Sequence, residues 1–159
     1  MKLIPTSSQT VGPFFSIGLA PLYQNAAAEA SNKTLTLAGK IFDGDRQPVP
    51  DAVLEFWSGD SFARVSTSED GSYSAVLELS LANSAAASSD VLIFMRGLLK
   101  PVRTRVYFGD FDAVKNNPEL KAVPGERIGT LLARKAPAPY RYGWDVFMQG
   151  DSETVFFHF

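Results

Sequence analysis

Apolar and polar residues alternate along much of the chain from residue 34 onward, which is the pattern of half-buried β-strands. In TLTLAGKIF (34–42), leucines alternate with threonines before a glycine and an Ile-Phe pair, as in a strand with a bend. AVLEFW (52–57) is denser in apolar residues, and alternation returns in FARVS (62–66) and SYSAVLEL (72–79). Asp-Gly pairs and prolines separate these segments, so each is predicted to be a short strand bounded by turns.

The second half of the chain continues this pattern. VLIFM (91–95) has five apolar residues in a row and predicts a strand that is buried on both faces. Three closing strands are predicted after a polar connection that could hold a helical turn: TLLARK (130–135), YGWDVFMQG (142–150) and ETVFFHF (153–159). Short strands, frequent turn signals and no strong helical period predict an all-β fold, an antiparallel β-sandwich or barrel.

The first 33 residues have a different character. They contain Pro5, a Ser/Thr cluster and the Gly12-Pro13 pair, and they continue into the Ala-rich segment PLYQNAAAEASNK (21–33). We therefore expect one domain of 159 residues, in which an extended N-terminal arm (1–33) precedes the sandwich (34–159).

Composition narrows the function classes. The net charge of −2 argues against a nucleic-acid or anionic-membrane partner, because both require a basic surface. The chain has no cysteine, so disulfides and thiolate metal sites are excluded. The opening MKLIPTSSQT lacks the apolar core of a signal peptide, and no apolar run approaches transmembrane length, so a cytoplasmic protein is expected.

One histidine, His158, limits the chemistry further. A Ser-His-Asp triad or a site with several histidine ligands would have to include it. A lone histidine beside a chain end is more often a surface residue than a ligand, and we interpret His158 in that way.

Arg96 is the most informative charged residue, because it follows the apolar run and precedes Gly97. A buried guanidinium without a partner is costly. Arg96 is therefore solvated, paired with a nearby carboxylate such as Asp90 or Asp110, or positioned to bind an anion. Arg103 and Arg105, which alternate with apolar residues, are expected on a solvent face or at a subunit contact.

One segment, GKIFDGDRQPVPDAVLEFW (39–57), resembles a pattern shared by prealbumin-like domains and implies a hairpin with an Asp-Gly turn, a Pro-Val-Pro crossing and an inward Trp57. Five other segments occur in order along the chain: TSSQTVGPFFSIGL (6–19), FMRGLLKPVRTRVYFGD (94–110), ERIGTLLARK (126–135), YGWDVFMQG (142–150) and QGDSETVFFHF (149–159). These five resemble the α subunits of protocatechuate 3,4-dioxygenases, which belong to the intradiol ring-cleavage dioxygenase family.

This resemblance implies a β-sandwich in α/β heterodimers that assemble into a larger oligomer. In the family, the β subunit holds Fe(III) through two tyrosines and two histidines. It inserts both atoms of O2 into protocatechuate to give 3-carboxy-cis,cis-muconate. The two histidine positions are Ser88 and Asp90 in this chain. The resemblance therefore implies no metal or other cofactor here and an Fe(III) in a partner β subunit.

The resemblance also implies a substrate-binding role, because the α subunit's arm and one arginine line the β subunit's active site. The matching positions are Thr10, Gly12, Pro13 and Arg96, with Arg96 pairing with the carboxylate of an aromatic substrate. Two other hypotheses stay open at this point. The chain could be a stand-alone binding or interaction module that has lost ring cleavage, or an independent enzyme with another metal, which the lone histidine disfavours.

Overall fold

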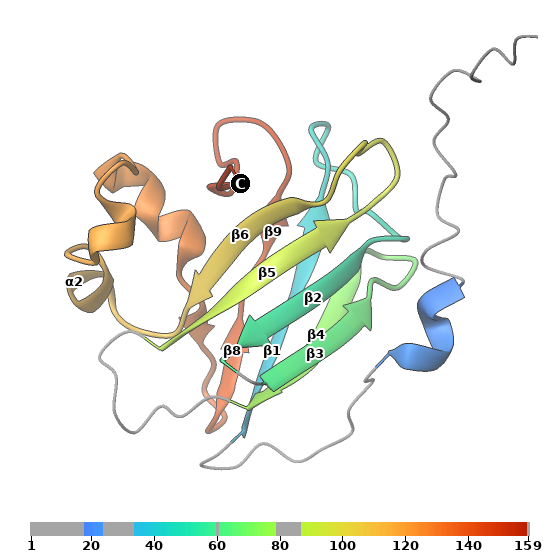
Figure 1. The fold of residues 1–159 in the computed structure, drawn as a ribbon, viewed down its shortest axis with the longest axis horizontal. Helices are drawn as coiled ribbons and strands as arrows, with labels where there is room; N and C mark the ends of the chain where they lie inside the picture. Colours follow the sequence, from blue (N-terminus) through green and yellow to red (C-terminus); the bar gives the residue numbers. More distant parts are fainter. Residues whose placement is uncertain (1–17, 24–33, 60, 79–86, 159) are drawn as a thin grey trace, which may run out of the picture.

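The computed structural model describes residues 18–23, 34–59, 61–78 and 87–158. They form two β-sheets packed face to face, with short helices beside one edge (Figure 1). The first sheet has the order β4-β1-β8-β7, and β9 also pairs with β1. Its strands are β1 (Thr34–Phe42), β4 (Ser72–Glu78), β7 (Arg134–Lys135), β8 (Arg141–Gly143) and β9 (Val146–Phe147).

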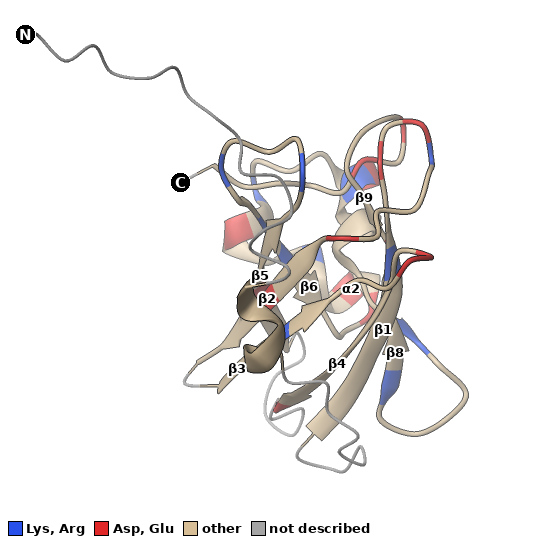
Figure 2. Ribbon diagram, turned by 90° about the vertical axis from the view of Figure 1, so that its right-hand side faces the viewer, with Lys and Arg blue, Asp and Glu red and all other residues tan. Residues whose placement is uncertain are grey.

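The second sheet has the order β3-β2-β5-β6, and every pairing in it is antiparallel. The side view separates β2, β3 and β5 of this sheet from β1, β4 and β8 of the first (Figure 2). The predicted all-β sandwich is therefore confirmed. The strands of the second sheet are β2 (Val53–Ser58), β3 (Ser61–Ser66), β5 (Ser88–Phe94) and β6 (Val102–Tyr107).

The core lies between the two sheets. Alternate residues of β1 and β5 meet there, including Leu35, Leu37, Val91 and Ile93, all of which are fully buried. A second apolar cluster lies under the connection that follows β6, where Tyr107 packs with residues of the short helices. The described helices are η1 (Ala20–Leu22), α2 (Phe111–Val114), η2 (Pro118–Leu120) and η3 (Gly125–Leu131). No helix in the described ranges has the length and apolar character needed to cross a membrane.

The end of the chain departs from the predicted antiparallel strands. β8 and β9 run parallel to β1, whereas β8 pairs antiparallel with β7 and is joined to it by the short connection 136–140. Residues 130–133 mostly belong to η3 and its exit, so only Arg134–Lys135 pair as β7. The predicted strand at 153–159 is wrong for the described residues, where Phe157 makes a single isolated bridge to Arg103.

Two burial predictions were also wrong. Trp57 was expected to face inward, but 46% of it is exposed, and Phe56 fills the core instead. Side chains alternate between the two faces of a strand, so burying Phe56 turns Trp57 outward. There the centroids of the Trp57 and Phe62 rings lie 4.5 Å apart. For the same reason β5 is fully buried on one face only, and Leu92 and Phe94 are only partly buried.

The Asp43-Gly44 turn closes a short antiparallel return, in which the Asp43 N–H donates to the Gln47 carbonyl at 2.9 Å and Phe42 bridges Pro48. The Asp70-Gly71 turn instead joins β3 and β4, which belong to different sheets. The Asp43 side chain accepts hydrogen bonds from the backbone N–H groups of Asp45 and Gln47, at 2.9 and 2.8 Å. The predicted Pro-Val-Pro segment (48–50) then carries the chain from β1 in one sheet to β2 in the other. This crossing places Asp51 immediately before β2, which matters for the site described next.

Candidate functional site at the ends of strands β2 and β5

Arg96 lies in a tight turn that ends β5. The backbone N–H of Leu98 donates to the carbonyl of Met95 at 3.3 Å, so Arg96 and Gly97 are the two central residues. Gly97 has φ +83°, the left-handed conformation that a type II turn requires at its second central residue. A Cβ on Gly97 would meet nothing within 4 Å, so the backbone angle and not lack of space favours glycine here.

The partner of Arg96 is Asp51, and not Asp90 or Asp110 as the sequence suggested. The Nε of Arg96 lies 3.1 Å from Oδ1 and 3.0 Å from Oδ2 of Asp51. Strand register explains the pair: Val53 of β2 lies opposite Phe94 of β5, and continuing this register by two residues brings Asp51 opposite Arg96.

The two side chains of this pair differ in exposure. The Asp51 side chain is 13% exposed, whereas that of Arg96 is 58% exposed. Among the described residues, the terminal Nη1 and Nη2 groups of Arg96 donate no hydrogen bond. Asp51 thus holds one nitrogen of a guanidinium whose terminal nitrogens have no protein partner there, an arrangement that can accept a carboxylate.

The other three predicted substrate-binding residues cannot be compared with this geometry. Thr10, Gly12 and Pro13 lie outside the described residues. Their placement relative to Arg96 therefore stays a prediction.

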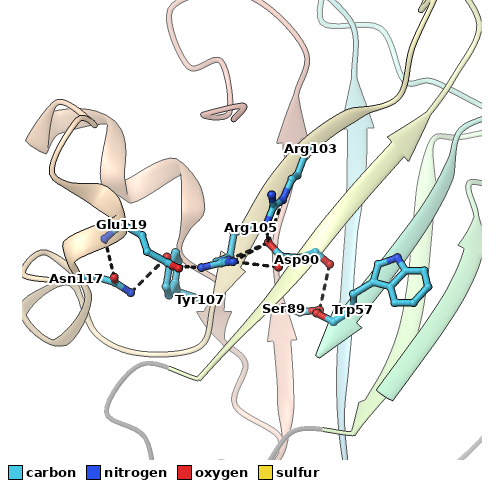
Figure 3. A network of polar contacts seen from close by, with 8 residues as sticks. All are labelled: Trp57, Ser89, Asp90, Arg103, Arg105, Tyr107, Asn117 and Glu119. Carbon is cyan, nitrogen blue, oxygen red and sulfur yellow. Dashed lines mark hydrogen bonds and ion pairs between the residues drawn. The ribbon is translucent and has the colours of Figure 1, made fainter. Parts of the chain in front are cut away.

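A second polar cluster surrounds Asp90, one of the two positions matched to iron-ligand histidines (Figure 3). Arg105 lies directly opposite Asp90 across β5 and β6 and donates from Nε to Oδ1 and from Nη2 to Oδ2, both at 3.0 Å. Arg103 donates from Nη2 to Oδ1 at 3.0 Å. The two arginines expected on a solvent face or at a subunit contact are partly exposed, 34% for Arg103 and 18% for Arg105, and share one carboxylate. Their role at a subunit contact stays a prediction.

The cluster continues beyond the sheet. Arg105 also forms an ion pair with Glu119 of η2. Asn117 holds this short helix by accepting a hydrogen bond from the Glu119 backbone N–H at 3.0 Å, and its Nδ2 lies 3.5 Å from the Tyr107 hydroxyl. The helical connection is therefore joined to β6 by charge as well as by apolar packing.

Proton affinities reflect these contacts. Burial raises the pKa of the Asp90 carboxyl, but the hydrogen bonds and positive charges of Arg105 and Arg103 outweigh burial and leave the pKa below its usual value. The hydrogen bond to Asp90 raises the pKa of Arg105. Burial raises the pKa of Tyr107. All three groups hold their ordinary charge states at neutral pH, so Asp90 is a charged acceptor between two cations.

This cluster does not fit a ferric ion. Both oxygens of Asp90 accept from guanidinium groups, so a metal cation there would displace them and face two positive charges. Ser88 has only a hydroxyl to offer. Among the described residues, no group of three or more histidine, aspartate and glutamate side chains is arranged to hold a metal.

His158 lies at the edge of the same region. It lines a cavity of about 230 Å³ together with Asp90, Arg103, Arg105 and Glu119. It is exposed, as the sequence indicated for a histidine near a chain end.

Asp51 is a functional candidate that the sequence did not reveal, and Glu119 is a structural partner of Arg105 that it did not reveal either. Asp51 follows a proline-rich crossing and resembles an ordinary turn residue in the sequence. Its relation to Arg96, 45 positions away, emerges only once β2 and β5 are paired. Only a correct prediction of the β2–β5 register would have indicated that Asp51 pairs with Arg96.

Comparison with solved structures supports the fold assignment. The dioxygenase domain of a dioxygenase–carbohydrate-binding protein fusion from Streptomyces sp. SirexAA-E superposes with a TM-score of 0.56 at 16% identity, covering 82% of this chain and 86% of that one. Hydroxyquinol 1,2-dioxygenase from Pseudomonas putida DLL-E4 has a TM-score of 0.54 at 15% identity, covering 77% of this chain and 57% of that one. At these identities the likeness concerns the fold alone.

Sequence comparison identifies the family. No family model matches the chain. A protocatechuate 3,4-dioxygenase alpha chain from Burkholderia cepacia is 38% identical, and the match covers 96% of each chain. A second protein of that name, from Pseudomonas putida, is 30% identical over 100% of this chain and 99% of its own length. This chain therefore belongs to the family of protocatechuate 3,4-dioxygenase alpha chains.

Proposed function

We propose that this chain is the non-iron-binding α-type subunit of a protocatechuate 3,4-dioxygenase. In the proposed complex, a partner β subunit carries Fe(III) and cleaves 3,4-dihydroxybenzoate with O2 to 3-carboxy-cis,cis-muconate. The α-type chain lines that active site and does not catalyse the reaction alone. The names of both relatives support the subunit assignment, and they do not favour the alternative of a stand-alone binding module.

The observation that carries this proposal is the exposed guanidinium of Arg96. Its Nε is held by Asp51, and its terminal nitrogens donate no hydrogen bond within the described ranges. A planar guanidinium binds a carboxylate through two parallel hydrogen bonds, and charge-assisted hydrogen bonds of this kind contribute about 1.5–3 kcal/mol. We assign Arg96 to the carboxylate of the aromatic substrate, which it would orient for cleavage in the partner's site.

The assignment of iron to the partner subunit is consistent with the chemistry at Asp90. Ring cleavage with O2 requires the ferric centre that the proposal assigns to the β subunit. In this chain the matched position is surrounded by Arg103 and Arg105, which suit a carboxylate and not a metal cation.

The N-terminal arm (1–33) completes the proposal. Thr10, Gly12 and Pro13 are assigned to the substrate pocket on the strength of their match to the family motif alone. A Gly-Pro backbone would let the arm approach a substrate ring without an intervening side chain. A larger α/β oligomer in the cytoplasm is part of the same proposal.

The test begins with purification of the tagged chain from its native host, followed by native mass and iron measurements. Recovery with a second chain and one iron per pair would support the proposal, whereas an iron-free oligomer of this chain alone would refute it. In the purified complex, Arg96→Ala should raise KM for protocatechuate by about 10- to 100-fold, the equivalent of one lost charged pair.

Catechol, which lacks the carboxylate, provides the control substrate. Its KM should change little in the Arg96→Ala complex. Arg96→Lys should give an intermediate KM for protocatechuate, because lysine keeps the charge and loses the planar fork. Equal effects of Arg96→Ala on the two substrates would contradict the assigned role.

A further inference from the structure

We propose that Asp51 is the positioning residue for Arg96, holding the guanidinium by its Nε so that the terminal nitrogens meet the substrate carboxylate in a fixed orientation. This inference rests on the proposed function, because it gives Asp51 a role only through Arg96. Asp51 itself does not touch the substrate.

The contacts of the Arg96 guanidinium differ between its Nε, which Asp51 holds, and its terminal nitrogens. Both carboxylate oxygens of Asp51 lie near the same nitrogen, Nε, at 3.0–3.1 Å. The Asp51 side chain is mostly buried, whereas most of the Arg96 side chain is exposed. A free arginine loses considerable rotamer entropy when it binds, so holding Nε in advance reduces the cost of engaging a ligand.

The backbone on the Asp51 side is firmly placed. The next residue, Ala52, donates its N–H to the Thr67 hydroxyl and accepts from the Thr67 N–H, both at 2.9 Å. The preceding segment, residues 48–50, has prolines at both ends, which fix φ at those positions. Asp51 is therefore attached to a stiff crossing between the two sheets.

The backbone on the Arg96 side is fixed in a complementary way. The Met95–Leu98 turn closes with a hydrogen bond, and Gly97 supplies the positive φ that reverses the chain. The β2–β5 register then brings the two side chains together from opposite strands. Both partners of the ion pair are thus placed by backbone geometry before any ligand arrives.

The negative charge of Asp51 makes it possible to distinguish positioning of Arg96 from electrostatic attraction of the anionic substrate. A carboxylate beside Arg96 offsets its positive charge, so Asp51 weakens the long-range attraction of an anionic substrate. If charge alone mattered, removing Asp51 would lower KM for protocatechuate. If Asp51 positions the arginine, its removal raises KM despite the more positive field.

The experiment uses the assembled complex and compares kcat/KM for protocatechuate with kcat/KM for catechol, a ratio that does not depend on the amount of active protein. Asp51→Ala should lower this ratio about 3- to 10-fold. Asp51→Asn keeps one acceptor for Nε and should lower it about 2-fold. Lys40→Ala, which removes an exposed ion pair with Asp70 elsewhere in the chain, is the matched control and should leave the ratio unchanged.

The double variant Arg96→Ala/Asp51→Ala tests whether the two residues act together. Asp51→Ala should have no further effect on the ratio when Arg96 is already alanine. If Asp51→Ala does not assemble with the partner, Asp51→Asn alone decides the question, since a raised ratio would show charge attraction and overturn positioning.

The failure of this inference differs from the failure of the proposed function. An unchanged or raised ratio in Asp51→Ala, together with a lowered ratio in Arg96→Ala, would overturn the positioning role and leave Arg96 as the substrate ligand. An unchanged ratio in Arg96→Ala would refute the assigned role of Arg96 and the inference about Asp51 with it.

Discussion

Two aspartate–arginine sites in this chain contain the same chemical groups but differ in how many partners each arginine has. At Asp90 one carboxylate is shared by Arg103 and Arg105, and Arg105 is also paired with Glu119. At Asp51 one carboxylate holds one nitrogen of Arg96, whose side chain remains mostly exposed. The number of partners and the exposure of the arginine, and not the residue types, distinguish a structural cluster from a site that can bind a ligand.

The position of each aspartate in the second sheet explains the difference. Asp90 lies within β5, directly opposite Arg105, and Arg103 lies two residues farther along the same face of β6. Asp51 precedes β2 by two residues, outside the region in which β2 and β5 are paired. Neighbouring strands therefore satisfy the arginines at Asp90, whereas the chain turns away after Arg96 and leaves its terminal nitrogens unpartnered among the described residues.

The largest expected effect on stability is at Asp90. Asp90→Ala should destabilise the protein by about 2–3 kcal/mol, because it leaves two partly buried guanidinium groups facing each other. Asp51→Ala removes a pair whose arginine is 58% exposed and remains solvated, so it should cost at most about 1 kcal/mol. Thermal unfolding midpoints of the purified variants would show the contrast, with Asp90→Ala lower by about 4–12 °C. Equal losses at the two sites would invalidate this comparison.

A smaller effect is expected from the turn that presents Arg96. Gly97→Ala should destabilise the protein by about 1 kcal/mol, because alanine resists the φ of +83° even though its Cβ would meet no neighbour. Gly125→Ala is the matched control, since Gly125 is equally open and lacks a positive φ, and it should be nearly neutral. Similar melting curves for the two variants would show that the turn conformation carries no strain.

The smallest expected effect is the pH dependence of the stability that Asp90 contributes, and it tests the comparison of the two sites most directly. The pKa of Asp90 is lowered in the folded state, so its contribution is fully present above the unfolded aspartate pKa of about 3.9 and is lost as pH falls through the folded value. The stability difference between wild type and Asp90→Asn should be constant from pH 7 to pH 5 and should shrink below about pH 4. Urea unfolding at several pH values would measure it, and a difference that grows in acid would contradict this account.

Much of the fold was predictable from local pattern. TLTLAGKIF became β1 with the predicted bounds, Thr34–Phe42, because leucine alternation marks one buried face. The family motifs also assign Arg96 to substrate binding, which stays a prediction. The parallel pairing of β8 and β9 with β1 was not predictable, because strand direction depends on a connection whose path no local pattern encodes.

The candidate site divides in the same way. The sequence by itself determined that the chain is an all-β member of its family, that Gly97 follows Arg96, and that serine and aspartate occupy the matched histidine positions. Only the tertiary structure decided that Asp51 holds Arg96, that Asp90 is taken by Arg103 and Arg105, and that Trp57 faces outward. The physical reason is that each of these contacts depends on strand register, and register is set by packing the two sheets together, not by residues close in sequence.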